Sequence, residues 1–214
     1  MEKHRLAYKA KAATGVLSIE AGGSGMFDEL TGLPSFRCFR EQLEARLHRH
    51  PCGQVAVLVL DIDRFKAFNT SLGHKAGDML LQQVTSRLRS NLSLASFLAR
   101  MGSDKFLLFH PFTTEREIHD LIRQIDGAFR QQLMIDRLEW KATLRIGVSL
   151  YPQDGADSST LIKRAEVALQ QAKFRTTISQ FYQTEMNRNE LDRFLLENDL
   201  HKALENDELH LVFQ

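Results

Sequence analysis

The feature that most constrains the fold is a continuous apolar run, residues 55–60, which ends directly in Asp61 and Asp63. The run is rich in β-branched side chains and does not alternate with polar ones, which is typical of a central strand covered on both faces. Carboxylates at the end of a buried strand are costly unless they are paired, hydrated or bound to a metal. From these residues alone, pairing of the two acids with Arg64 and Lys66, or capping of the next loop, is the simplest prediction.

Composition and charge narrow the class of protein. The chain has 214 residues, of which 43% are hydrophobic and 26% charged, which predicts one globular domain with flanking pieces. A net charge of +1 gives no reason to expect nucleic acid as a partner. The apolar runs are too short to insert into a membrane and no signal peptide is visible, so we expect a cytoplasmic protein. Cys38 and Cys52 make neither a disulfide framework nor a zinc pattern.

Periodicity along the chain predicts strands interleaved with helices. Helices are expected at residues 35–49, from 73 to about 88, at 115–133 and from 157 or 158 to 173, and strands at 55–60, 140–150 and 178–182. Residues 5–20 are weakly amphipathic, 188–206 form a charged amphipathic pattern, and 208–214 alternate like a strand. The expected fold class is α/β (α+β), with a mixed central β-sheet and helices on both faces.

A β-hairpin is expected between the helical pattern that begins at residue 73 and the one at 115–133. Two apolar runs, residues 94–98 and 106–109, flank a tip made of Gly102, Ser103, Asp104 and Lys105. The tip holds an acid, a base and a glycine able to take a positive φ. Taken alone, this is an ordinary hairpin turn.

Several segments together resemble the GGDEF domain, the fold of diguanylate cyclases. Residues 28–33 resemble the family's D-x-L-T-G-L, residues 61–69 its D-x-D-x-F-K-x-x-N, and residues 73–78 its G-H-x-x-G-D. Residues 147–152 and 165–173 resemble its closing pieces, with Glu166 and Gln170 substituted. The segments follow in order, at family spacing, over about residues 26–182. The resemblance implies a nucleotidyl-cyclase-like fold with the signature motif on the hairpin.

The signature itself departs from the family at two positions. Residues 102–106 stand in place of G-G-D-E-F, with Ser103 for the second glycine and Lys105 for the glutamate. The resemblance implies that Asp61, the Ile62 carbonyl and Asp104 are the metal-ligand positions, with Asp104 also the remaining catalytic position. In the family, two divalent cations such as Mg²⁺ are held here against the triphosphate of GTP. An ammonium at position 105 repels such a cation by several kcal/mol at an effective dielectric of about 20.

Other family positions are retained. Asn69 and Asp78 match the residues that contact the guanine edge, although Asp78 alone could equally be a first-turn helix acid. Lys173 matches a lysine that contacts phosphate, whereas Thr176 and Thr177 replace the glycine and arginine that follow it. The nucleotide-binding positions that the resemblance implies are Phe65, Lys66, Asn69, Asp78, Gly102 and Lys173.

The domain organisation follows from the resemblance. Residues 1–25 are expected to be a linker or the end of an upstream domain, and residues 26–183 the GGDEF-like domain. Residues 184–214 resemble the linker helix and first strand of an EAL domain, the cyclic di-GMP phosphodiesterase fold, without the E-A-L motif itself.

The expected function is that of a degenerate GGDEF module in a cyclic di-GMP signalling protein. It would bind GTP, with a weakened Mg²⁺ site, or form a homodimer, and so regulate an attached EAL domain; as this piece it is not expected to be an enzyme. Two alternatives stay open. One is an active diguanylate cyclase that converts two GTP to cyclic di-GMP, and the other is a structural spacer without a ligand.

Overall fold

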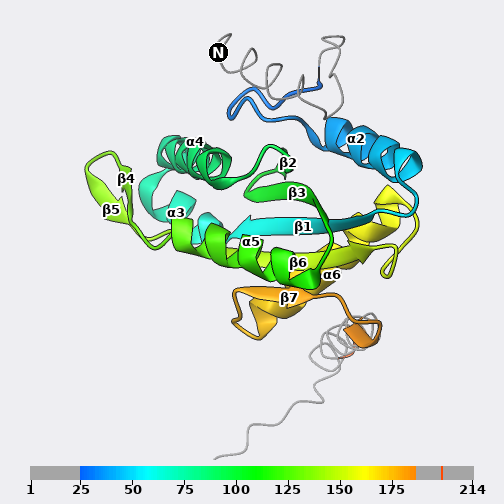
Figure 1. The fold of residues 1–214 in the computed structure, drawn as a ribbon. Coiled ribbons are helices and arrows are strands. Elements are labelled where there is room, and N and C mark those ends of the chain that lie inside the picture. Colours follow the sequence, from blue (N-terminus) through cyan, green and yellow to red (C-terminus); the bar gives the residue numbers. More distant parts are fainter. Residues whose placement is uncertain (1–24, 187–198, 200–214) are drawn as a thin grey trace, which may run out of the picture.

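The computed structural model describes residues 25–186 and residue 199, and it places a five-stranded sheet between two layers of helices (Figure 1). The strand order is β2-β3-β1-β6-β7, and all neighbours are antiparallel except β6 and β7. The predicted fold class is confirmed. The elements are α2 (Phe36–Arg49), β1 (Gln54–Ile62), α3 (Phe65–Leu72), α4 (His74–Asn91), β2 (Phe97–Gly102), β3 (Lys105–Phe112), α5 (Glu115–Ala128), β4 (Leu133–Ile135), β5 (Leu138–Trp140), β6 (Leu144–Tyr151), α6 (Ser158–Phe174) and β7 (Ser179–Phe181).

The central strand β1 divides the core into two halves. Its even-numbered residues, such as Leu58 and Leu60, pack with residues of α3, α4 and α5. Its odd-numbered residues, such as Val57 and Val59, pack with residues of α2 and α6 on the opposite face. Because side chains alternate along a strand, Asp61 continues the odd series and points to the face that α6 covers.

The structure corrects several predicted boundaries. The first arm of the signature hairpin, expected at 94–98, is β2 at Phe97–Gly102, and Leu94 is exposed. Two further corrections lie around the β4-β5 hairpin. The helix expected at 115–133 ends at Ala128, because Leu133 and Ile135 are buried on either side of exposed Met134, which is the alternation of a strand. The strand expected at 140–150 begins at Leu144, and Trp140 belongs to β5 of the small β4-β5 hairpin. Sequence periodicity missed this hairpin and α3, because their patterns are too short to distinguish from loops.

Some predictions lie outside the described residues. These are the helical patterns at 5–20 and 188–206, the strand at 208–214, and most of the flanking segments 1–25 and 184–214. The proposed domain boundaries therefore stay predictions. Within the part of the chain that the structure describes, no helix is both long and apolar enough to cross a membrane.

The close contact between β6 and α6 gives a testable prediction. A Cβ at Gly147 would lie 2.0 Å from the Ala165 carbonyl oxygen and 2.2 Å from the Leu169 nitrogen, both backbone atoms that no rotamer change can move. Gly147→Ala should therefore lower the free energy of unfolding by about 2–3 kcal/mol, measured by urea denaturation. Gly127→Ala in α5 is the matched control, because nothing lies within 4 Å of its added Cβ. Equal unfolding midpoints for both variants would contradict this packing.

Candidate functional site

The buried carboxylate of Asp61 lies among three basic side chains. Asp61 is 1% exposed, and its cross-strand neighbours are Lys105 on β3 and Arg145 on β6. Lys173 approaches from α6, with its Nζ 2.6 Å from Asp61 Oδ2. The acid is therefore paired, as the cost of burying a charge requires, and its partner comes from α6.

A second ion pair joins the signature hairpin to the same helix. Lys105 Nζ lies 3.4 Å from Glu166 Oε1, and the two side chains are 29% and 33% exposed. Glu166 and Lys173 lie about two helical turns apart, so they share one face of α6. Asp61, Lys105, Glu166 and Lys173 thus form a network of alternating charge, which we call the four-charge network. Lys105 is not a freely solvated hairpin lysine.

Arg145 forms an ion pair with Asp63, the second acid at the end of β1. Its Nη2 lies 3.1 Å from Asp63 Oδ2, and its Nη1 donates to the Thr177 carbonyl oxygen over 2.8 Å. In the described chain Asp63 pairs with this arginine, not with Arg64 or Lys66. Sequence reasoning missed Arg145, because its contact with Asp63 depends on the pairing of β1 with β6 and no local pattern indicates it.

The hairpin tip is fixed against the end of β1. The Ile62 amide donates to the Asp104 carbonyl oxygen over 3.3 Å. Gly102 has a φ of 134° and Ser103 a φ of 45°, so the residue that replaces the second glycine of the signature adopts a left-handed conformation. Such a conformation costs a non-glycine residue about 1–2 kcal/mol. The sequence-predicted positions Asp61, Ile62, Gly102 and Asp104 therefore come together at one edge of the sheet.

The electrostatics of Asp61 reflect competing causes. Burial raises the pKa of its carboxyl, and the negative charge of Asp104 raises it further. The ammonium groups of Lys173 and Lys105 oppose this shift but do not cancel it, so the pKa of Asp61 lies above its ordinary value. Asp104 therefore lies close enough to Asp61 for their charges to interact.

The positions implied in guanine recognition lie on α3 and α4. The Asn69 carboxamide lies close to Gly77, where an added Cβ would be 1.9 Å from Asn69 Oδ1. Asp78, the next residue, is exposed and lies beyond the first turn of α4, so it is not a first-turn acid. Lys66 is exposed on α3, whereas the Phe65 side chain is buried in the core and leaves only its backbone for a ligand.

The donor groups at this edge do not fit the two-cation site that the resemblance implies. Among the described residues, no three His, Cys, Asp or Glu side chains are grouped so as to hold a metal ion. Asp61 Oδ2 is engaged by Lys173, and Lys105 places an ammonium where the family has a carboxylate. Mg²⁺ is commonly held by one or two carboxylates together with substrate phosphates, but here the ammonium groups of Lys173 and Lys105 lie beside the carboxylates and repel a cation.

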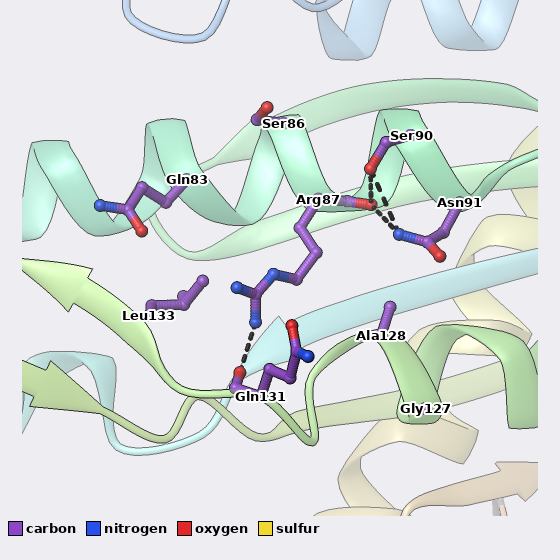
Figure 2. Close-up of a pocket in the computed structure, with 9 residues that line it drawn as sticks. All are labelled: Gln83, Ser86, Arg87, Ser90, Asn91, Gly127, Ala128, Gln131 and Leu133. Atoms are coloured by element: carbon purple, nitrogen blue, oxygen red, sulfur yellow. Dashed lines mark hydrogen bonds between the residues drawn. The ribbon is translucent and has the colours of Figure 1, made fainter.

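A separate cavity lies between α4, α5 and β4. It has a volume of about 490 Å³, and Figure 2 shows Arg87 reaching from α4 toward the Gln131 carbonyl oxygen, to which it donates a hydrogen bond. The lining residues are Gln83, Ser86, Arg87, Ser90, Asn91, Gly127, Ala128, Gln131 and Leu133. None of them is a sequence-predicted site residue, so the candidate site remains the edge that holds the four-charge network.

Comparison with known proteins agrees with the fold described above. The profile of the family described as "Diguanylate cyclase, GGDEF domain" matches residues 25–177. The chain belongs to the GGDEF family. This GGDEF domain superposes on the solved GGDEF domain of TpbB from Pseudomonas aeruginosa with a TM-score of 0.73 and 29% identity, covering 76% of this chain and 97% of that one.

Two curated relatives are cyclic di-GMP phosphodiesterases by name. NbdA of Pseudomonas aeruginosa is 34% identical over 191 residues, and PdeR of Escherichia coli is 32% identical over 189 residues. The alignments cover 88% and 87% of this chain but 24% and 28% of the relatives. The chain therefore spans about a quarter of the length of these proteins, and this GGDEF domain is a kind of domain found in cyclic di-GMP signalling proteins.

In this GGDEF domain the opening motif is tied to the signature hairpin by one arginine. Arg100 Nη1 lies 2.8 Å from Asp28 Oδ1, and its Nη2 donates to the Ser103 carbonyl oxygen over 2.7 Å. Asp28 also accepts hydrogen bonds from the Thr31 amide and hydroxyl. Burial raises the pKa of Asp28, but these hydrogen bonds and the Arg100 charge outweigh burial and leave the pKa below its ordinary value.

The direction of that shift predicts a pH dependence. A carboxyl with a depressed folded-state pKa adds stability above its unfolded pKa and loses it as pH falls. Asp28→Asn should therefore lower the free energy of unfolding by about 1–2 kcal/mol at pH 7, and the gap to the parent should shrink below about pH 4. Urea denaturation at both pH values measures this, with exposed Glu29→Gln as the control. A gap that is constant with pH would contradict the proposed role of the Asp28 charge.

Proposed function

We propose that this GGDEF domain binds a guanine nucleotide without converting it to cyclic di-GMP, and that it serves as a regulatory module of a cyclic di-GMP signalling protein. The observation that supports this most directly is the ion pair between Lys105 and Glu166. It fills the fourth signature position with a cation that has its own partner in the fold. The signature therefore lacks a carboxylate that family chemistry uses, while the lysine that replaces it has a partner in the fold.

Loss of turnover follows from the charges at the hairpin. Cyclase chemistry of the family type requires divalent cations that neutralise the triphosphate and activate the attacking hydroxyl. Two unit charges 4 Å apart interact by about 4 kcal/mol at an effective dielectric of 20, so an ammonium at position 105 strongly disfavours a nearby cation. Lys105 also removes a carboxylate that could accept a proton, and Thr177 lacks the guanidinium of the family's arginine.

Nucleotide recognition is supported by the groups that are retained. Asn69 and Asp78 offer a carboxamide and a carboxylate for the guanine edge, and Lys66, Gly102 and Lys173 are retained at the other positions proposed to contact the nucleotide. A site built to hydrogen-bond a particular base rejects analogues that leave its polar groups unpaired. We therefore expect GTP to bind in preference to ATP.

The regulatory role is supported by the relatives. Both NbdA and PdeR are phosphodiesterases by name, and this chain aligns with only part of each. We propose that residues 184–214 lead into an EAL domain, that the GGDEF domain modulates it from the cytoplasm, and that a homodimer is the regulatory unit. An active cyclase and a spacer without ligand are the alternative outcomes of the tests below.

The proposed loss of turnover can be tested directly. Incubation of the chain with GTP and Mg²⁺ or Mn²⁺, followed by chromatography, should yield no cyclic di-GMP. The double change Ser103→Gly with Lys105→Glu should move the site toward activity, because it restores the glycine and the carboxylate, although Thr177 still limits it. Clear formation of cyclic di-GMP by the parent chain would show that the domain is a working cyclase.

The proposed guanine selectivity can be tested through Gly77, which lies next to the Asn69 carboxamide. Gly77→Ala should displace the Asn69 carboxamide, because its Cβ would lie 1.9 Å from Oδ1. Loss of one base contact should weaken GTP binding by about tenfold while ATP binding changes little. Calorimetry with both nucleotides measures this, and Asn69→Ala should add no further loss in the Gly77→Ala background. Gly127→Ala is the control. Equal binding of GTP and ATP by the parent chain would count against guanine recognition.

A further inference from the structure

The four-charge network points to an unusual way of holding a nucleotide. We infer that Lys105 and Lys173 take the place of divalent cations, so that this site binds the triphosphate of GTP in its metal-free form. The inference rests on the proposed function and adds to it the chemical form of the ligand. Its starting point is the mismatch between the donor groups at this edge and a two-cation site.

Lys173 already engages one oxygen atom of the Asp61 carboxylate. Its Nζ lies 2.6 Å from Asp61 Oδ2, and the Asp61 side chain is 2% exposed. A divalent ion could reach this oxygen only by displacing the ammonium, which would then be left close to a like charge. The pair is therefore expected to persist when ligand binds, with the exposed third of the Lys173 side chain facing the phosphates.

Lys105 is the movable cation of the network. Its pair with Glu166 is longer, at 3.4 Å, and both side chains are about one-third exposed. Partly exposed pairs of this kind contribute little to stability, so exchange of the Glu166 carboxylate for a phosphate oxygen costs little. A lysine is a point charge on a flexible stem, which suits binding of phosphate without fixing the oxygen geometry that catalysis requires.

The Asp104 carboxylate distinguishes metal-free binding of the triphosphate from binding through a metal ion. It is half-buried at the hairpin tip, its charge reaches Asp61, and no ion pair involves its side chain in the described part of the chain. If a metal ion joined the nucleotide to the site, removing this carboxylate would remove a ligand and weaken binding. If the triphosphate binds without metal, removing it takes away a repulsive charge and strengthens binding. The two modes of binding therefore predict opposite signs for Asp104→Asn.

The experiment measures GTP affinity by calorimetry in excess EDTA and again in excess MgCl₂. The parent chain should bind GTP at least as tightly in EDTA as in MgCl₂. Lys105→Glu should weaken binding in EDTA by about tenfold or more, with recovery on addition of Mg²⁺, and Asp104→Asn should tighten binding in EDTA. Lys163→Glu is the matched control, because it makes the same change of net charge at an exposed position of α6.

Each alternative outcome has a defined meaning. GTP binding by the parent chain only in the presence of Mg²⁺ overturns the metal-free inference and leaves the proposed nucleotide binding intact. Weaker binding of Asp104→Asn, or an equal loss in Lys163→Glu and Lys105→Glu, also overturns the inference. Absence of GTP binding in both buffers overturns the proposed function together with the inference. Circular dichroism of each variant verifies that the hairpin changes leave the fold intact.

Discussion

A carboxylate buried at the end of the central strand is the constraint on which the site depends. Asp61 belongs to a strand covered on both faces, and the alternation of β1 directs it toward α6 rather than toward water. A buried charge must be compensated by a close partner, and Lys173 provides it. The position of α6 across the sheet is therefore an electrostatic requirement as well as a packing one, and the same helix face presents Glu166 to the hairpin.

The signature hairpin is held from three directions. The Ile62 amide contacts its tip from β1, Arg100 joins its Ser103 carbonyl to the opening motif, and Glu166 contacts Lys105 from α6. The two backbone contacts fix the tip, and the substitutions in the signature change the charge that it carries. A positioned lysine at the hairpin suits a module that binds a ligand, because binding needs only a charge of the right sign in the right place. Turnover also needs divalent cations, which that lysine repels.

Local pattern predicted much of this fold but little of the charge network. The apolar run of β1 and the helix that Asp157 caps were visible in the sequence, because each depends on neighbours a few residues away. The partners Lys105 and Glu166 lie 61 residues apart, and their contact follows from strand register and helix placement. For the same reason the close approach of Asn69 to Gly77 could not be predicted, since it depends on how α3 crosses α4.

The most direct test of the central claim is a crystal structure of this chain with GTP, grown in the presence of Mn²⁺ and measured at the manganese absorption edge. The account predicts that Nζ of Lys105 and Nζ of Lys173 lie within hydrogen-bond distance of phosphate oxygens, and that no anomalous peak lies between Asp61 and Asp104. A manganese ion coordinated by both carboxylates and the triphosphate, with Lys105 still paired to Glu166, would contradict it.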